Sequence, residues 1–112
     1  MLNMNRNKTS TNTMVSIGMP VYNGAEFIRK ALDSLLNQTH TNFELIISDN
    51  QSTDNTEIIV QEYAKKDNRI KYVKSETNEG AISNLNKVFS LAKYDYFMWA
   101  SHDDFWSYKY IE

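Results

Sequence analysis

Two adjacent carboxylates lie near the C-terminal end of the chain, in the segment "WASHDDFW". Large aromatic side chains flank Asp103 and Asp104, and the segment contains neither lysine nor arginine to neutralise them. Carboxylate oxygens suit Mg²⁺ and Mn²⁺, which usually keep waters and substrate phosphates in their remaining coordination positions. The pair therefore predicts a divalent-metal site that a phosphorylated ligand completes. The alternative is a solvated turn in which one aspartate caps the next helix.

His102 precedes this pair and could serve as a metal ligand, as an acid or base, or as a hydrogen-bond partner of the carboxylates. The chain has one other histidine, His40, in a polar segment, and it has no cysteine. These counts exclude a metal site built from several histidines and a thiolate zinc site. The aspartates are therefore the expected ligands.

Polar residues also follow an earlier apolar run, "FELII", which is typical of a buried strand. Asp49 and Asn50 stand just beyond that run, where their side chains could hydrogen-bond to the edge of a planar base. The alternative is an Asx-turn that satisfies local backbone groups. Tyr22 offers a ring for stacking on a base, or it covers the core. From the residues alone, both alternatives stay open at each position.

Neither of the two common glycine-rich phosphate loops occurs in the chain. No G-x-G-x-x-G follows the first apolar run, and no G-x-x-x-x-G-K-[ST] is present anywhere. A bound diphosphate is therefore expected to need a metal ion, and Asp103 and Asp104 are the expected ligands of that ion.

The segments that must position these residues alternate between strand and helix patterns. Strands are expected over residues 15–19, 43–49, 70–74 and 94–100. Helices are expected over roughly 25–37, from an Asp54–Glu57 capping box (with Thr53 as another possible cap) to "KKDN", and along Ile82, Leu85, Phe89 and Ala92. This order predicts an α/β fold, a mainly parallel sheet with helices on both faces. Ligands bind beyond the carboxyl ends of such strands, so "PVYN", "SDNQS" and "SHDD" should converge at one edge.

Length and composition narrow the class of protein. The 112 residues make one domain or part of one, and 41% apolar residues with one proline favour a globular chain. Twelve basic against fourteen acidic residues argue against a nucleic-acid partner. No apolar run approaches the roughly 18 residues of a membrane span.

Residues 1–13 are polar and lack the apolar core of a signal peptide, so we expect a disordered leader before a region spanning 14–112. Without cysteine, the default compartment is the cytoplasm.

Several motifs, in order, make residues 15–112 resemble the nucleotide-binding half of the family 2 glycosyltransferases, which have the Rossmann-like GT-A fold. The matching residues are Pro20, Tyr22 and Asn23 for P-x-Y-N; Ser34, Gln38 and Thr39 for S-x-x-x-Q-T; Asp49, Ser52 and Asp54 for D-D-x-S-x-D; Asn78 and Gly80 for N-x-G; and Ser101, His102, Asp103 and Asp104 for the D-x-D region.

The resemblance implies an inverting transfer of a sugar from a nucleoside-diphosphate sugar, a UDP-sugar, to a saccharide or lipid-linked acceptor in cell-wall or polysaccharide synthesis. It implies Mn²⁺ or Mg²⁺ as cofactor and a location in the cytoplasm, with peripheral contact at the inner membrane face. By position, the implied nucleotide-binding residues are Pro20, Tyr22, Glu26, Asp49, Asn50 and Asp103, and the implied metal ligands are Asp103 and Asp104.

Two departures from the family pattern bear on these roles. Asn50 stands where many relatives have aspartate, and an amide donates as well as accepts hydrogen bonds. Ser101 stands where the longer D-x-D-D form begins, which shifts the metal to Asp103 and Asp104.

Family members continue into an acceptor-binding half that holds the catalytic base, so the base is expected beyond Glu112. We therefore expect a truncated enzyme that binds donor, transfers little or no sugar, and self-associates through uncovered apolar surface. The alternatives are a non-catalytic nucleotide-binding or interaction module and a sugar nucleotidyltransferase. The latter normally has a Gly- and Arg-rich loop that "MPVYNGAEF" lacks.

Overall fold

The computed structural model describes residues 13–39 and 41–101, which form a four-stranded parallel sheet with three helices. The elements are β1 (Val15–Val21), α1 (Ile28–Leu36), β2 (Phe43–Asp49), α2 (Thr56–Lys66), β3 (Ile70–Lys74), α3 (Ala81–Leu91) and β4 (Tyr96–Trp99). The strand order is β3-β2-β1-β4, and all three pairings are parallel. Strand and helix alternate along the chain, as the sequence predicts.

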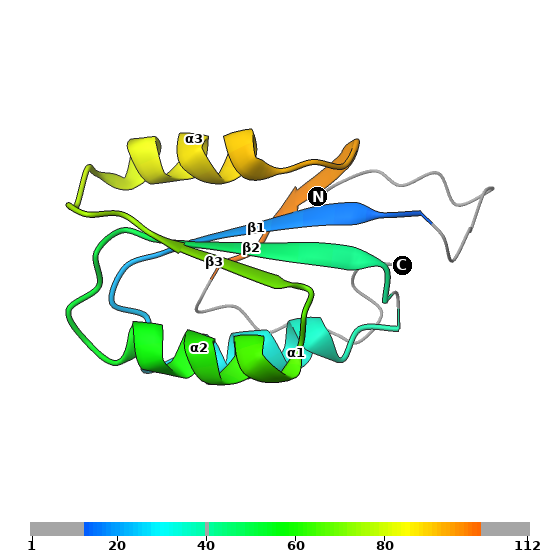
Figure 1. Ribbon diagram of the computed structural model, residues 1–112, viewed down its shortest axis with the longest axis horizontal. Coiled ribbons are helices and arrows are strands. Elements are labelled where there is room, and N and C mark those ends of the chain that lie inside the picture. The colour runs from blue at the N-terminus through cyan, green and yellow to red at the C-terminus, as the bar shows by residue number, and fades with distance from the viewer. Residues whose placement is uncertain (1–12, 40, 102–112) are drawn as a thin grey trace.

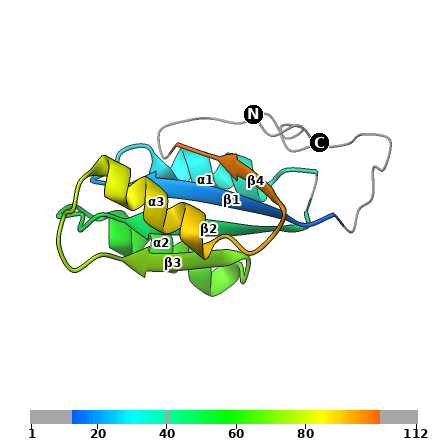
Figure 2. The same cartoon turned by 90° about the horizontal axis from the view of Figure 1, so that it is seen from above.

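The helices cover both faces of the sheet. α1 and α2 lie on one face and α3 lies on the other (Figure 1). Figure 2, viewed from the α3 side, shows α3 across the central strands, with β4 and β3 at opposite edges. The expected architecture is therefore confirmed. Across the described ranges, every helix falls short of the length and apolar character that a bilayer-spanning segment needs.

The apolar core lies between the sheet and the α1–α2 layer. Ile17 and Met19 of β1 and Ile47 of β2 are fully buried, as are Leu32 of α1 and Val60 of α2. Each such side chain contributes about 1.5–3 kcal/mol when it leaves water. This face therefore provides most of the hydrophobic stabilisation of the described chain.

The face beneath α3 is packed differently. A Cβ atom added to Gly18 would lie 2.3 Å from Cγ1 of Val88 and 2.8 Å from Cζ of Phe97, so only glycine lets α3 approach β1 this closely. Beside this contact, Ser48 Oγ donates to Asn84 Oδ1 (2.6 Å), and Asn84 Nδ2 donates to the Ser48 carbonyl (2.9 Å). A close contact and a buried hydrogen-bonded pair thus dock α3.

Strand β1 continues to Val21, beyond the end expected at residue 19, and it contains Pro20. The Gly18 carbonyl accepts from Ala100 N on the β4 side (2.9 Å). In a strand, the backbone N–H and C=O groups of residues two apart point toward the same neighbouring strand. Pro20 therefore faces the β4 side, past the last β1–β4 pair, Gly18 with Trp99. Its missing N–H costs the strand no ladder bond, which is why the strand tolerates proline there.

Two expectations about helix starts were wrong. Helix α1 begins at Ile28, three residues later than expected, after a turn in which the Gly24 carbonyl accepts from both Phe27 N (3.1 Å) and Ile28 N (2.9 Å). The capping box of Asp54 and Glu57 does not form: α2 follows Asn55, and Glu57 makes an ion pair with Lys74 (2.8 Å). Asp54 still bonds to the start of α2, because its Oδ1 accepts from Thr56 N (3.0 Å), while its Oδ2 accepts from Ala25 N in another loop. The last strand is also shorter than residues 94–100.

Candidate functional site

The carboxyl ends of the strands meet at one edge, on the left of Figure 1. From β1 the chain moves through α1, β2 and α2 to β3 in one direction, and then α3 returns over the opposite face to β4 on the other side of β1. This reversal creates a switch point between β1 and β4, where open α/β sheets bind ligands. The hydrogen bond from Ala100 N to the Gly18 carbonyl keeps the end of β4 beside β1.

Three of the sequence-predicted residues border the switch point or the loop that follows it. Pro20 is the last but one residue of β1 and is partly buried, Tyr22 follows the strand with 45% of its surface exposed, and Glu26 is exposed in the next turn. An exposed aromatic ring at this edge is available to stack on a planar ligand. Contact between these residues and a nucleoside stays a prediction.

Asp49, at the end of β2, is fully buried. Its Oδ1 accepts from Ser52 N (2.8 Å) and Ser52 Oγ (2.6 Å), and its Oδ2 accepts from the Tyr72 hydroxyl (2.7 Å). Burial, and then the hydrogen bond to Asp49, raises the pKa of the Tyr72 phenol, which therefore keeps the proton that it donates. This geometry is the turn-capping alternative for Asp49, and base contact by its carboxylate stays a prediction.

Asn50 is also buried, and its amide joins two loops. Nδ2 donates to Asn78 Oδ1 (2.9 Å) and to the Gly80 carbonyl (3.2 Å), while Oδ1 accepts from Glu79 N (3.1 Å). Its backbone N donates to the Val21 carbonyl (2.9 Å), next to Tyr22. The structure thus brings Asn50 together with the N-x-G motif, which the sequence could not pair with it.

The loops after β1 and β2 are joined by hydrogen bonds from the other motif residues. Asn23, at φ 51°, accepts from Thr53 N on its Oδ1 (2.8 Å), and its backbone N donates to Ser52 Oγ (2.9 Å). Asp54 Oδ2 accepts from Ala25 N (3.1 Å). Although burial by itself raises the pKa of Asp54, hydrogen bonds from Thr56 and from Ala25 N hold it below its ordinary value. The motif residues therefore hold the loops after β1 and β2 together at the carboxyl edge of the sheet.

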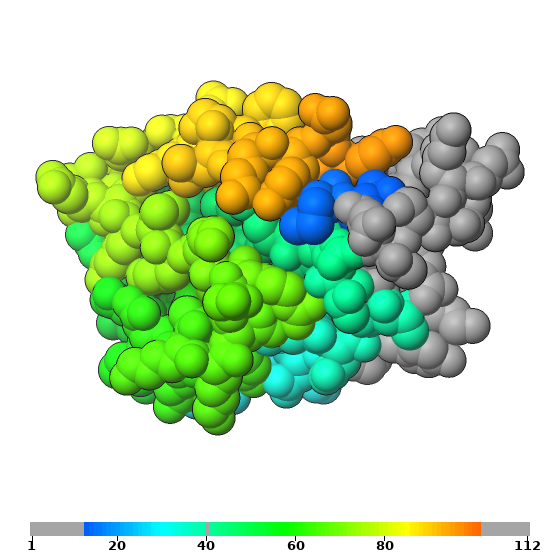
Figure 3. All heavy atoms as spheres, turned by 45° about the vertical axis from the view of Figure 1, so that its right-hand side comes forward, coloured from blue at the N-terminus to red at the C-terminus, as the bar shows by residue number. Residues whose placement is uncertain are grey.

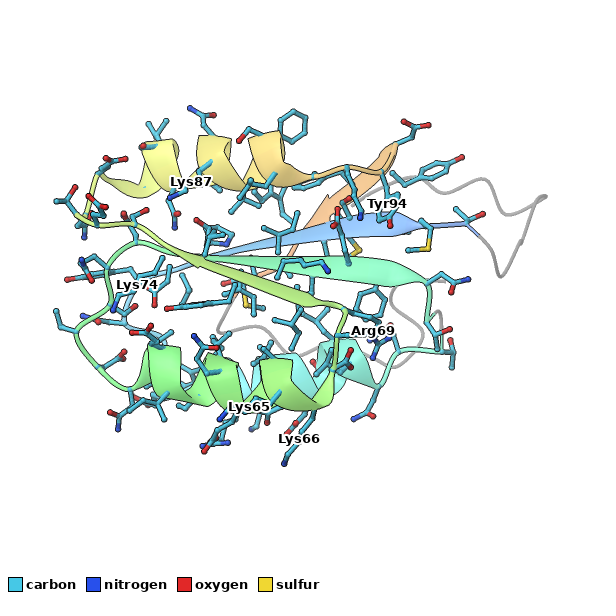
Figure 4. All side chains as sticks on the ribbon, viewed as in Figure 1. Lys65, Lys66, Arg69, Lys74, Lys87 and Tyr94 are labelled. Carbon is cyan, nitrogen blue, oxygen red and sulfur yellow. The ribbon has the colours of Figure 1, made fainter. Side chains whose placement is uncertain are left out.

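Basic side chains at the β3 side of this edge were missed by the sequence analysis. Lys74 ends β3 beside Glu57, whose hydrogen bond raises the pKa of the Lys74 ammonium. Lys87 extends from α3 toward the strands (Figure 4), and its Nζ donates to Ser75 Oγ (3.2 Å). The only signal in the sequence was their place in strand and helix patterns, which does not show that they share an edge.

The expected metal ligands Asp103 and Asp104 lie outside the described residues, as does His102. Within residues 13–39 and 41–101, no group of three or more His, Cys, Asp or Glu side chains could hold a metal ion. Strand β4 and Ser101 nevertheless run along the switch point directly before them in the sequence. Two carboxylates suit a hard divalent cation, so the donor set fits Mg²⁺ or Mn²⁺.

The parallel sheet, its helices on both faces and its switch point define a doubly wound α/β protein, a class that binds ligands beyond the carboxyl ends of its strands. Comparison with known families is more specific. The model for glycosyl transferase family 2 matches residues 16–112, and the chain belongs to that family.

Individual relatives agree with this assignment. The chain is 44% identical over 99 residues to an uncharacterised glycosyltransferase of Rickettsia typhi. The matched region covers 88% of this chain and 30% of the relative. It is 38% identical over 104 residues to TuaG of Bacillus subtilis, named as a teichuronic acid biosynthesis glycosyltransferase. The matched region covers 93% of this chain and 41% of TuaG. The chain thus spans less than half the length of these relatives.

Two solved structures share the fold. TarS 1–349 of S. aureus in complex with UDP superposes with a TM-score of 0.80 at 29% identity, covering 88% of this chain and 30% of that one. The mannosyltransferase PcManGT from Pyrobaculum calidifontis, in complex with GDP-Man and Mn²⁺, gives a TM-score of 0.76 at 25% identity, covering 82% and 28%. The expected GT-A fold is confirmed.

Proposed function

We propose that this chain is the donor-binding part of a glycosyltransferase that transfers a sugar, with inversion, from a UDP-sugar to a saccharide or lipid-linked acceptor. The observation that carries the proposal is the switch point between β1 and β4, with the exposed ring of Tyr22 beside it. The complexes of TarS with UDP and of PcManGT with GDP-Man support a nucleoside diphosphate as the ligand.

Each predicted site residue has a role in this proposal. The nucleoside lies against Pro20 and Tyr22, with Glu26 at the rim. Asp49 and Asn50 stand behind it at the end of β2. Asp103, assisted by Asp104, would hold the Mn²⁺ or Mg²⁺ ion. When bound, such an ion stabilises the negative charge that develops on the departing diphosphate. The Mn²⁺ in the PcManGT complex supports this cofactor.

The proposal includes the setting of the reaction. The teichuronic acid role named for TuaG supports a product in cell-wall or other polysaccharide synthesis. We place the activity in the cytoplasm, with peripheral contact at the inner membrane face where a lipid-linked acceptor would be held.

Self-association is part of the same proposal. Helix α3 exposes 74% of Ile82 and 61% of Phe89, and the Phe89 ring stacks edge-on against Phe97 (5.2 Å), which stacks against Trp99 (4.7 Å). In Figure 3, the atoms of α3 and of the following orange segment form one continuous upper surface. Exposed apolar side chains that contact one another mark an interaction site, and a second copy of the chain is the partner we propose.

Calorimetry of UDP binding tests the proposed function. The chain should bind UDP with MnCl₂ or MgCl₂ and lose most of that affinity in excess chelator, because the carboxylates alone repel the diphosphate. Asp103→Ala should remove most of the metal-dependent binding and Asp104→Ala less. Asp95→Ala, which removes an exposed carboxylate before β4, is the matched control and should bind like the wild type.

Two outcomes would contradict this account. Equal affinity with and without chelator would remove the metal from the proposal. A larger loss for Asp104→Ala than for Asp103→Ala would move the principal ligand by one residue.

A further inference from the structure

The amide of Asn50 has its hydrogen-bonding groups turned toward the protein. With 4% of its surface exposed, Asn50 donates from Nδ2 to Asn78 Oδ1 and to the Gly80 carbonyl, and accepts on Oδ1 from Glu79 N. A side chain that reads a base must offer some of these groups to the ligand. Here the loop before α3 takes both Nδ2 donors and one acceptor position of Oδ1 instead.

We propose that Asn50 is a positioning residue: its amide fastens the 78–80 loop to the end of β2 and so fixes one wall of the nucleotide site, without reading the base. This inference rests on the proposed function and assigns Asn50 a role within that site.

The fastened loop belongs to the opposite face of the sheet. β2 continues below the sheet into α2, whereas the loop after β3 rises above it into α3 (Figure 1). Asn78 Oδ1 also accepts from Gly80 N (2.9 Å), and Gly80, at φ 93°, immediately precedes α3. Gln51 adds a second bond, from its Nε2 to the Glu76 carbonyl. The two residues after β2 therefore hold both ends of this loop across the edge.

The same residue is tied to the β1 side of the site. Asn50 N donates to the Val21 carbonyl, one residue before Tyr22 (2.9 Å). A displacement of Asn50 would therefore move the 78–80 loop relative to the ring proposed to contact the nucleoside. Affinity would fall for every nucleotide alike, because the shape of the site changes and its base-recognition groups do not.

An aspartate at position 50 tests whether these hydrogen bonds hold the loop. Asn50→Asp keeps the shape of the side chain but replaces two N–H donors with an oxygen that only accepts. That oxygen would face Asn78 Oδ1 and the Gly80 carbonyl, which are both acceptors. Protonation of the new carboxyl would return one donor, so lower pH should partly restore the contact.

The test compares Asn50→Asp, Asn50→Ala and the matched control Asn86→Asp, an exposed asparagine on α3. UDP and CDP titrations with Mn²⁺ give affinities, and hydrogen exchange of the amides of residues 76–82 reports the loop. We expect both Asn50 variants to lose about tenfold in affinity, by the same factor for UDP and CDP, with faster loop exchange. Asn86→Asp should match the wild type.

Two further measurements separate positioning from general loss of structure. As pH falls from 7 toward 4, Asn50→Asp should regain affinity relative to Asn50→Ala, because only the former can recover a donor. Asn78→Ala should reproduce the base-independent loss, and the Asn50→Ala, Asn78→Ala double variant should lose less than the sum of the two single losses.

Several results would overturn the inference. A changed UDP-to-CDP ratio in either Asn50 variant would make Asn50 a base reader, and unchanged loop exchange would show that it holds no loop. A wild-type chain that binds neither nucleotide would overturn the proposed function and the positioning role with it. Wild-type binding with unaffected variants would overturn the role of Asn50 alone.

Discussion

At the scale of single residues, Asp49 shows how a buried polar group serves the fold at a ligand edge. Its two oxygens accept three hydrogen bonds, from Ser52 N, Ser52 Oγ and the Tyr72 hydroxyl. A buried donor that loses its acceptor costs about 1–3 kcal/mol, more than the net gain of an ordinary hydrogen bond. The energetic weight of Asp49 therefore falls on stability.

We predict that Asp49→Ala lowers the free energy of unfolding by about 1–3 kcal/mol, because Ser52 and Tyr72 lose their buried acceptor. Urea unfolding measures this change. Tyr72→Phe, which removes one of the three bonds and leaves Asp49 in place, should cost less. Unchanged stability of Asp49→Ala, together with UDP binding weakened by roughly 1.5–3 kcal/mol, would instead identify Asp49 as a base contact.

At the scale of elements, Arg69 fastens the amino edge of the sheet, at the opposite end from the site (Figure 4). Its guanidinium donates to both oxygens of Asp67 (2.9 and 2.6 Å), to the Leu36 carbonyl and to the Thr41 carbonyl. It also lies 4.3 Å from the ring centre of Phe43. One side chain thus joins the end of α1, the start of β2 and the turn before β3.

The hydrogen bond from Arg69 lowers the pKa of Asp67, which makes the contribution of this pair dependent on pH. Because the folded-state pKa lies below the unfolded one, the stabilisation is present above the unfolded value, about 3.9, and is lost as pH falls through the folded value. Asp67→Asn should therefore lower the free energy of unfolding by about 1 kcal/mol at pH 7, because the Arg69–Asp67 pair is bidentate but partly exposed. This cost should shrink below about pH 4.

Thermal unfolding of Asp67→Asn and the wild type between pH 3 and 7 measures this prediction. Glu62→Gln is the control, because Glu62 pairs with Arg29 on α1 where both side chains are about half exposed. The control should follow the wild type at every pH. A cost for Asp67→Asn that stays constant across this range would contradict the proposed ion pair.

At the scale of the whole molecule, the helices on the two faces of the sheet differ in how much of their apolar surface is buried. Ile28, Ala31, Leu32 and Leu35 of α1 are fully buried. On α3, the buried residues are Asn84 and Val88, while most of its apolar side chains face solvent. The surface proposed for self-association therefore lies on the α3 face.

We predict that Phe89→Ser shifts the chain toward monomer, because it removes the ring that joins α3 to the aromatic side chains of β4. Sedimentation velocity over a range of concentrations measures this shift. Ile58→Ser on α2 is the matched control, because Ile58 and Phe89 are both 61% exposed but lie on opposite faces of the sheet. A wild-type chain that is monomeric at all concentrations would contradict the proposed self-association.

The sequence by itself determined the class of the fold, the family and the bounds of two strands. Residues 43–49 and 70–74 form strands as expected, and the alternation of elements predicts the parallel sheet. These features depend on apolar periodicity and on turn residues within a few positions of one another, which local sequence records. The family motifs are likewise short segments in a set order.

Only the tertiary structure decided the strand order and the use of the motif residues. Pro20 lies inside β1 because its missing donor faces past the last β1–β4 pair, and Asp54 bonds both to Thr56 at the start of α2 and to Ala25 in another loop. Asn50 meets Asn78 across 28 positions of sequence. Whether a buried amide faces a ligand or a neighbouring loop depends on which donors and acceptors the fold brings within hydrogen-bond distance, and local pattern does not contain that information.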